Sequence, residues 1–176
     1  MEDTINATSR AIDDLCNRYF YKNSVDETRY FTPTQRDQCL VGDLLSITTM
    51  KTDDNLDRTY ATTWVSGTDY DLYPYNSALG SEPYFRVDRV RNSANSFVKG
   101  EPKFVQIAGV WGWPAVPLNV KHACLLWSMR TWERHKTILG VSAVTALGTM
   151  QVKVPPPDPD VEILLSNFIQ TITGVI

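Results

Sequence analysis

The segment with the clearest potential for chemistry is an acidic run, Asp53-Asp54-Asn55-Leu56-Asp57. Its first, third and fifth positions match the start of a calcium-binding loop, in which side-chain oxygens coordinate the ion. The rest of such a loop is missing, because Arg58 stands where the turn needs glycine and Trp64 where it needs a bidentate glutamate. Polar runs of this kind are also typical of the tip of a β-hairpin. We therefore predict a hairpin tip here, and no metal site.

Histidine and cysteine side chains could bind a metal or act as a nucleophile and its base, but their spacing favours neither. On a helix, His122 and Cys124 point about 200° apart, so they cannot share one ion. The sequence has no Cys-x-x-Cys pair, no Gly-x-Ser-x-Gly elbow and no phosphate-binding loop. We interpret Cys124 as a small core residue and His135 as a cation at a helix C-terminus. We predict no catalytic residue and no cofactor, although a triad assembled from distant segments stays open.

Three tyrosines around a proline, Tyr70, Tyr73 and Tyr75, form the other candidate site. Tyrosine offers a large, rigid contact area with a polar tip, which suits a protein interface or a stacking platform for a sugar. The same rings could instead fold back over a sheet. The sequence leaves both interpretations open.

The elements that must position these residues change character along the chain. Apolar residues at helical spacing, including Ile12, Leu15 and Cys16, predict an N-terminal helix over 7–21. Short runs rich in Thr, Tyr, Val and Trp then predict a β insertion over 28–108. Its strands are expected at 28–32, 44–51, 58–65, 84–90 and 102–108.

The last third of the chain reads as two helices joined by a linker. Pro117 suits a first helical turn and Gly140 a helix end, and the apolar residues between them are too many for a peripheral helix. Pro155-Pro156-Pro157 must be extended, and Asp158 can cap the helix that follows. The expected ranges are 117–138 for the central helix, 140–157 for the linker, and 158–176 for the C-terminal helix with an apolar tail.

These elements predict an α+β fold: a small helical bundle of the N-terminal, central and C-terminal helices, with an antiparallel β insertion between the first and central helices. A length of 176 residues fits one domain. With 43% hydrophobic and 21% charged residues, the chain can bury a core without disulfides or a structural metal. Three widely spaced cysteines indicate a reducing compartment.

Charge and hydropathy exclude several classes of function. Seventeen Lys and Arg against 20 Asp and Glu give a net charge of −3, with no basic stripe to track phosphates. The N-terminus lacks the basic and apolar regions of a secretory signal. The most apolar stretch, 107–120, is broken by glycine and proline and is shorter than the ~20 residues that cross a bilayer. We expect no tight DNA binding and no membrane segment.

Four passages follow one another in a recognisable order. They are Leu44-Leu45-Ser46-Ile47-Thr48-Thr49 with Lys51-Thr52-Asp53-Asp54; Thr68-Asp69-Tyr70-Asp71-Leu72-Tyr73-Pro74-Tyr75-Asn76; Val105-Gln106-Ile107-Ala108-Gly109-Val110-Trp111-Gly112-Trp113 before Val116-Pro117; and Pro159-Asp160-Val161-Glu162-Ile163-Leu164-Leu165. Together they resemble the head-tail connector (adaptor, or head-completion) proteins of long-tailed bacteriophages. The third passage is similar to that family's hydrophobic strand, Gly-x-(Trp/Phe)-Gly, x-x-x-Pro and helix. The resemblance covers about residues 8–170 and lies in the order of structural motifs.

The resemblance implies a non-enzymatic structural protein of the phage neck that needs no cofactor. Its subunits would form a homo-oligomeric ring, twelvefold in the virion, beneath the portal protein of the DNA-filled head. The ring would receive a tail-side neck or tail-completion protein and let DNA pass without specific binding. Such a protein is made in the bacterial host cytoplasm and resides at the head-tail interface of the virion.

A ring subunit needs lateral and axial contact faces, and an apolar terminal stretch needs a partner. We expect the segment from Asp158 onward to dock on a neighbouring subunit or on the portal, and the 44–65 hairpin with the tyrosine loop to make ring or axial contacts. Alternatives are a ligand- or receptor-binding β module that uses the Tyr70–Tyr75 loop, and a hydrolase. Candidate portal or subunit contacts are Phe168, Ile169, Ile172, Val175 and Ile176. Candidate ring or axial contacts are Tyr70, Tyr73, Tyr75, Asp53 and Asp54.

Overall fold

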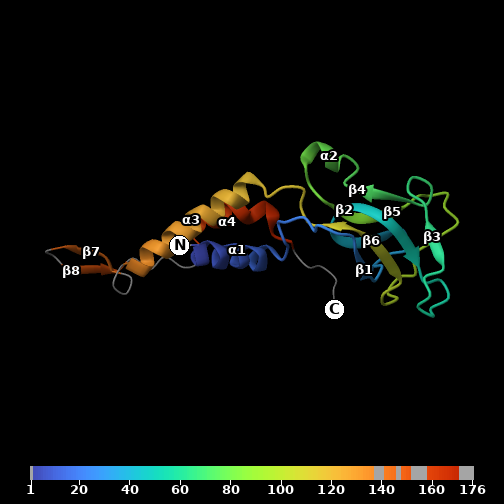
Figure 1. The fold of residues 1–176 in the computed structure, drawn as a ribbon, viewed down its shortest axis with the longest axis horizontal. Helices are drawn as coiled ribbons and strands as arrows, with labels where there is room; N and C mark the ends of the chain where they lie inside the picture. Colours follow the sequence, from blue (N-terminus) through green and yellow to red (C-terminus); the bar gives the residue numbers. More distant parts are fainter. Residues whose placement is uncertain (1, 137–140, 146–147, 152–157, 171–176) are drawn as a thin grey trace. The chain divides into compact units, whose positions relative to one another are not determined.

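The computed structural model describes residues 2–136, 141–145, 148–151 and 158–170. These residues group into two compact units, which we describe separately (Figure 1). The sheet unit comprises residues 19–115. The helical unit contains the helices on either side of that segment in the sequence. The described helices are all too short or too polar to cross a membrane.

The sheet unit is built, within the described residues, on a six-stranded antiparallel sheet. The strands run in the order β1-β6-β2-β5-β4, and β3 pairs with the end of β2. The long strand β2 therefore contacts three partners and is the centre of the sheet. Short helix α2 (Ser77–Gly80) lies between β4 and β5. The strand bounds are β1 Glu27–Phe31, β2 Gln38–Thr52, β3 Thr62–Trp64, β4 Tyr70–Tyr73, β5 Tyr84–Arg89 and β6 Val105–Trp111.

Strand β6 shows why this sequence forms a sheet. Alternate residues from Val105 to Trp111 are buried, which is the period-two pattern of a strand with one face on the core. Gly109 is required on that face, because a Cβ there would lie 2.1 Å from the Ser46 carbonyl oxygen of β2. The register between β2 and β6 shifts on both sides of this contact, so the two backbones meet closely at an irregular point.

Aromatic residues from different strands and loops fill the core of the sheet unit. Trp64 stacks on Phe97 with ring centroids 4.6 Å apart, and its indole N–H donates to the Thr52 hydroxyl at 2.9 Å. Trp111 is fully buried, and its indole N–H donates to the Glu27 carbonyl at 2.8 Å. Each indole ring is thus buried in the core while its N–H group keeps a hydrogen-bond acceptor.

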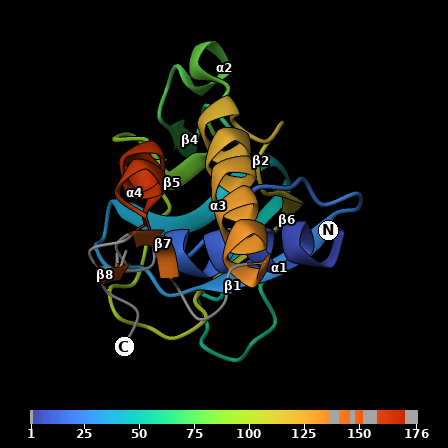
Figure 2. The same cartoon turned by 90° about the vertical axis from the view of Figure 1, so that its left-hand side faces the viewer.

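The helical unit consists of α1 (Glu2–Cys16), α3 (Leu118–Lys136) and α4 (Pro159–Leu165), with a 3-10 turn after α4 (Figure 2). Both α1 and α4 pack against α3. Gln170, two residues after the turn, ties this region to α1, because its N–H donates to the Cys16 carbonyl at 3.0 Å. The buried apolar residues of the three helices are Ile12 and Cys16, Val120 and Ala123, and Val161 and Leu165.

Arg130 of α3 holds the start of α4. Asp158 caps α4 by accepting the N–H of Asp160, and Arg130 forms ion pairs with both carboxylates, at 2.8 Å to Asp160. These contacts raise the pKa of Arg130, the hydrogen bond to Asp160 first among their causes. The N-terminus of α4 therefore carries negative charge where the helix dipole favours it, and Arg130 of α3 offsets part of that charge.

The expected architecture, a helical bundle with a β insertion, is wrong, although the α+β class holds. The sheet is the larger structural body, and most of the largest fully buried side chains, such as Trp111, Phe97 and Phe104, belong to it. The helices form a separate unit. Local periodicity identified the elements, but it could not show which of them would share a core.

The N-terminal helix begins and ends about five residues earlier than the expected 7–21. It ends at Cys16 because Asn17 adopts a left-handed conformation with φ of 52°. Phe20, which falls within the expected range, lies beyond the helix and packs on Trp113 with ring centroids 5.5 Å apart. The central helix agrees with 117–138 to within two residues.

Three β assignments also differ from expectation. Strand β2 begins at Gln38 rather than 44, and β4 lies where a loop was expected. The expected linker over 140–157 contains a hairpin of β7 (Val141–Thr145) and β8 (Gly148–Gln151). Its three prolines lie outside the described residues.

Candidate functional site

The tyrosine loop lies at the edge of the sheet, where β4 ends. Tyr73 is the cross-strand partner of Arg86 on β5, and a cis peptide bond joins Tyr73 to Pro74. Tyr75 follows and remains 65% exposed. Tyr70, in contrast, is buried in the core of the sheet unit. The structure therefore brings Tyr73 and Tyr75 together at the surface and separates Tyr70 from them.

An arginine–carboxylate pair on β5 organises this loop. The Arg86 guanidinium lies over the Tyr73 ring, with Cζ 4.0 Å from its centroid. The same group contacts Asp88 twice, through Nε at 2.6 Å and through Nη2 at 2.8 Å. The Tyr75 hydroxyl donates to Asp88 Oδ2 at 3.1 Å. The hydrogen bond from Arg86 to Asp88 raises the pKa of Arg86, and the hydrogen bond from Tyr75 to Asp88 raises the pKa of Tyr75.

This arrangement makes a rigid aromatic surface, which we call the tyrosine–arginine patch (Leu40, Tyr73, Tyr75, Phe85, Arg86 and Asp88). The rings of Tyr75 and Phe85 each meet Tyr73 edge-on with centroids 5.3 Å apart. Leu40 pairs with Arg86 from the other side, in β2, and is exposed. Because Asp88 neutralises Arg86, the patch offers aromatic and aliphatic contact area rather than a free cation for phosphate. Rigid tyrosine and arginine are the residues that dominate binding energy at protein interfaces.

The acidic loop does not present its first carboxylate to solvent. Asp53 is buried, and its two oxygens accept the backbone N–H groups of Asp57 at 3.0 Å and Arg58 at 2.9 Å. Asp53 thus shapes the turn after β2, while Asp54 is exposed. Among the described residues, no group of three or more His, Cys, Asp or Glu side chains is placed to hold a metal ion. Of this candidate pair, Asp54 is therefore the residue available for a contact.

The candidate contacts near the C-terminus are placed in part. Phe168 ends the 3-10 turn Ser166–Phe168 and is half-buried, and Ile169 is exposed. The remaining three, Ile172, Val175 and Ile176, lie outside the described residues.

Sequence reasoning missed Arg86 and Asp88 as organisers of the tyrosine loop. Their signal was their position on either side of Val87, which puts both on the face of β5 opposite the buried residue. Nothing local marked β4 as their neighbour. The pairing of Tyr73 with Arg86 depends on which strands lie side by side.

Of the comparisons with known proteins, the one with solved structures finds similar chains. No protein-family model and no curated protein sequence matches this chain. One similar solved chain comes from the neck of an empty gene transfer agent (GTA) particle computed with C6 symmetry. It is 14% identical, with a TM-score of 0.55 over 98% of this chain and 79% of that one. A chain from the virion of a native GTA particle is 15% identical, with a TM-score of 0.51 over 98% of this chain and 77% of that one. At these identities the likeness shows a shared fold.

Proposed function

We propose that this chain is a non-enzymatic structural subunit of the neck of a phage-like particle. The main observation in its support is that 98% of the chain shares its fold with a chain from the neck of a GTA particle, which is itself phage-like. The order of the sequence passages that resemble head-tail connectors supports the same proposal independently. Both units would act together as one connector subunit.

In this proposal, copies of the chain form a ring in the virion, at the junction of head and tail. The portal protein lies on one side, a tail-side neck or tail-completion protein lies on the other, and DNA passes through the ring during ejection. The C6 symmetry used for the similar neck is compatible with six or twelve copies, since both rings contain a sixfold axis. We favour twelve, as the connector resemblance implies.

The axial or ring contacts would use the surfaces that remain exposed. These are the tyrosine–arginine patch, Asp54 in the turn after β2, and Ile169 after α4. An aromatic patch preorganised by Arg86 and Asp88 loses little conformational entropy on binding, which favours a specific protein contact. The net charge of −3 is compatible with a channel that does not hold the phosphates of passing DNA.

The experiment that tests this proposal is reconstitution with the portal ring of the same particle. Purified chain and portal are mixed, co-sedimented and imaged by negative stain. The expected result is an added layer of density with the symmetry of the ring. Failure to bind at high micromolar concentration, with both proteins folded, would contradict the neck assignment.

The exposed ring of Tyr75 also supports a second candidate, a ligand-binding β module. A sugar stacked on this patch would change tyrosine fluorescence when glycans are added. A neck subunit predicts no such change and does predict the portal-bound layer, so the two experiments separate the candidates.

A further inference from the structure

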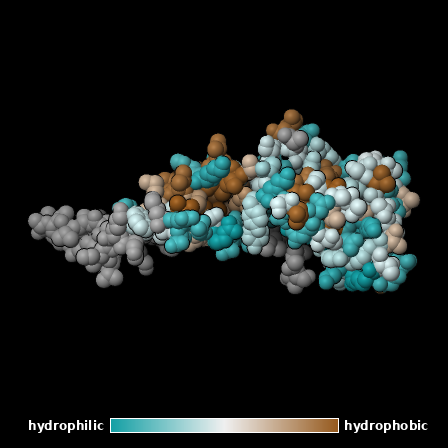
Figure 3. Space-filling model, in the orientation of Figure 1, coloured by the Kyte–Doolittle hydropathy of each residue, from teal (hydrophilic) through white to brown (hydrophobic). Residues whose placement is uncertain are grey.

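Three apolar side chains lie exposed on one face of α3. Leu118, Leu125 and Met129 are 81%, 55% and 58% exposed, although leucine and methionine usually lie inside proteins. Their spacing of seven and four residues places them within about 40° of one another around the helix. We call these three residues the α3 ridge. Hydrophobic side chains gather over α3 and α4 in Figure 3.

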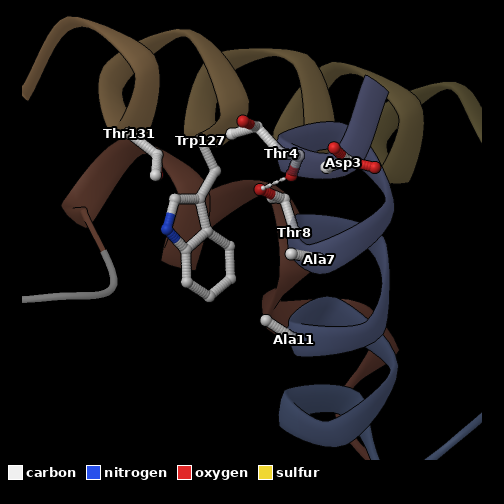
Figure 4. Close-up of a pocket in the computed structure, with 7 residues that line it drawn as sticks. All are labelled: Asp3, Thr4, Ala7, Thr8, Ala11, Trp127 and Thr131. Atoms are coloured by element: carbon white, nitrogen blue, oxygen red, sulfur yellow. Dashed lines mark hydrogen bonds between the residues drawn. The ribbon is translucent and has the colours of Figure 1, made fainter. Parts of the chain in front are cut away.

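A groove of about 440 Å³ runs between α1 and α3, and we call it the α1–α3 groove. Its α1 wall carries small side chains, including Ala7 and Ala11, and Trp127 forms the opposite wall (Figure 4). The Thr8 hydroxyl donates to the Thr4 carbonyl at 2.8 Å, so this polar group is already satisfied within α1. The groove is therefore mainly apolar. Its lining residues are Asp3, Thr4, Ala7, Thr8, Ala11, Trp127 and Thr131.

The ridge and the groove lie on opposite sides of α3. At about 100° per residue, Trp127 and Thr131 point about 180° away from the α3 ridge. A single twofold contact cannot bury both surfaces, because it would need them on the same side. Repeated head-to-tail contacts can bury both the ridge and the groove in every copy except the two end copies of an open filament. Such a filament closes into a ring when the rotation between copies allows it.

We infer that the α3 ridge of one copy docks in the α1–α3 groove of the next copy of this chain. This inference rests on the proposed function, because it names the lateral contact of the proposed ring. Charge supports a second copy as the occupant: exposed Lys121 lies near the Leu118 end of the ridge, and Asp3 lines one end of the groove. Ala7 and Ala11 leave room for the side chains of Leu125 and Met129.

The contact is expected to be weak between isolated copies. Stable protein interfaces bury about 1,200–2,000 Å² in total, and one helical ridge in one groove covers only part of such an area. Closure of a ring adds a second contact for every copy and raises the effective concentration of each partner. A test must therefore trap the contact rather than rely on a stable dimer.

Chemical cross-linking with a bismaleimide traps it. Met129→Cys on the ridge and Ala7→Cys in the groove are combined in a Cys124→Ala background; the two remaining cysteines, Cys16 and Cys39, are buried. The expected result at high micromolar concentration is a ladder of dimers, trimers and larger species on a denaturing gel. Each single-cysteine variant should give nothing beyond a dimer.

Matched controls keep the test decisive. The pair Val65→Cys and Ala7→Cys places the first thiol on the sheet unit at 57% exposure, close to the 58% of Met129, and should give no ladder. Adding Leu125→Glu to the ridge–groove pair should reduce the ladder at least fivefold, and adding Leu56→Glu, at the same 55% exposure, should not. Circular dichroism verifies that each variant is folded.

Two results would overturn the inference. One is a ridge–groove pair that gives only dimers, and the other is product no greater than that of the Val65 control pair. A portal-bound layer formed by a chain that gives no ladder would refute this lateral contact and leave the neck assignment intact. A ladder without portal binding would refute the neck assignment and leave the contact between copies.

Discussion

Asp53 carries a carboxylate that could bind a metal ion, but in this protein it stabilises a turn. Both of its oxygens accept backbone N–H groups inside a buried turn, and hydrogen bonds to a charged group contribute about 1.5–3 kcal/mol each. We predict that Asp53→Ala lowers the free energy of unfolding by about 2–4 kcal/mol, measured by urea denaturation. Asp54→Ala, at an exposed position, should change it by less than about 0.5 kcal/mol. Equal effects of the two substitutions would contradict this role for Asp53.

Asp69 gives the sheet unit a dependence on pH. The Ser93 hydroxyl donates to its carboxylate at 2.6 Å and the Val65 N–H at 2.9 Å, and the bond from Ser93 is the larger cause of its lowered pKa. A carboxylate with a lowered folded-state pKa stabilises fully above its unfolded pKa of about 3.9 and loses that contribution as pH falls through the folded value.

We therefore predict that stability declines as the pH falls below about 4, and that Ser93→Ala makes the decline shallower. Urea denaturation at several pH values measures both slopes. Other carboxylates contribute to the decline in the unmodified protein and in the Ser93→Ala variant alike, so the difference between their two slopes is the quantity to compare. Identical slopes would show that the Ser93 hydrogen bond does not set the pKa of Asp69.

At the scale of the elements, β2 and β6 approach each other closely because Gly109 has no side chain. A Cβ at Gly109 would meet the Ser46 carbonyl oxygen at 2.1 Å, and backbone atoms cannot move aside without changing the strand register. We predict that Gly109→Ala destabilises the sheet unit by about 2–4 kcal/mol in thermal or urea unfolding. Gly42→Ala, on β2 with open space at its Cβ position, serves as the control and should cost far less.

The ion pairs of Arg130 join two elements of the helical unit. Because Arg130 and Asp160 are partly exposed, solvent screens their ion pair and it should add little to the global stability. The local effect is larger, since Asp158 also caps α4. We predict that Arg130→Ala speeds amide hydrogen exchange several-fold at positions 160–165 of α4 and leaves the exchange of β6 unchanged. Uniform acceleration across both units would indicate global unfolding instead.

At the scale of the whole molecule, the tyrosine–arginine patch is the proposed contact with another neck component. Interface tyrosines that act as hot spots contribute at least ~2 kcal/mol, which corresponds to more than tenfold in affinity. We predict that Tyr75→Ala weakens binding to the portal or to the tail-side protein at least tenfold, measured by co-sedimentation. Tyr19→Ala, at an exposed tyrosine outside the patch, is the matched control. Unchanged affinity for both partners would remove the patch from the axial contacts.

The sequence alone determined most of what depends on local geometry. Helical spacing and the proline at 117 located α3 to within two residues, and Asp158 with Pro159 located the start of α4. The β-rich composition located β5 to within one residue and β6 to within three, and the turn composition of 53–57 identified the region between β2 and β3. The order of these motifs resembles that of phage head-tail connectors, and a chain from the neck of a GTA particle shares this chain's fold.

Only the tertiary structure decided which faces meet and which stay exposed. Tyr70 and Tyr75 are alike in sequence context, yet one is buried and the other exposed, because Tyr70 on β4 packs in the sheet core and Tyr75 lies beyond the end of that strand. Likewise, the apolar residues of α3 were expected to lie in a core, while Leu118, Leu125 and Met129 lie on a face that α1 and α4 do not cover. Local spacing sets the direction of a side chain around its own element, but burial depends on neighbours brought near by distant parts of the chain.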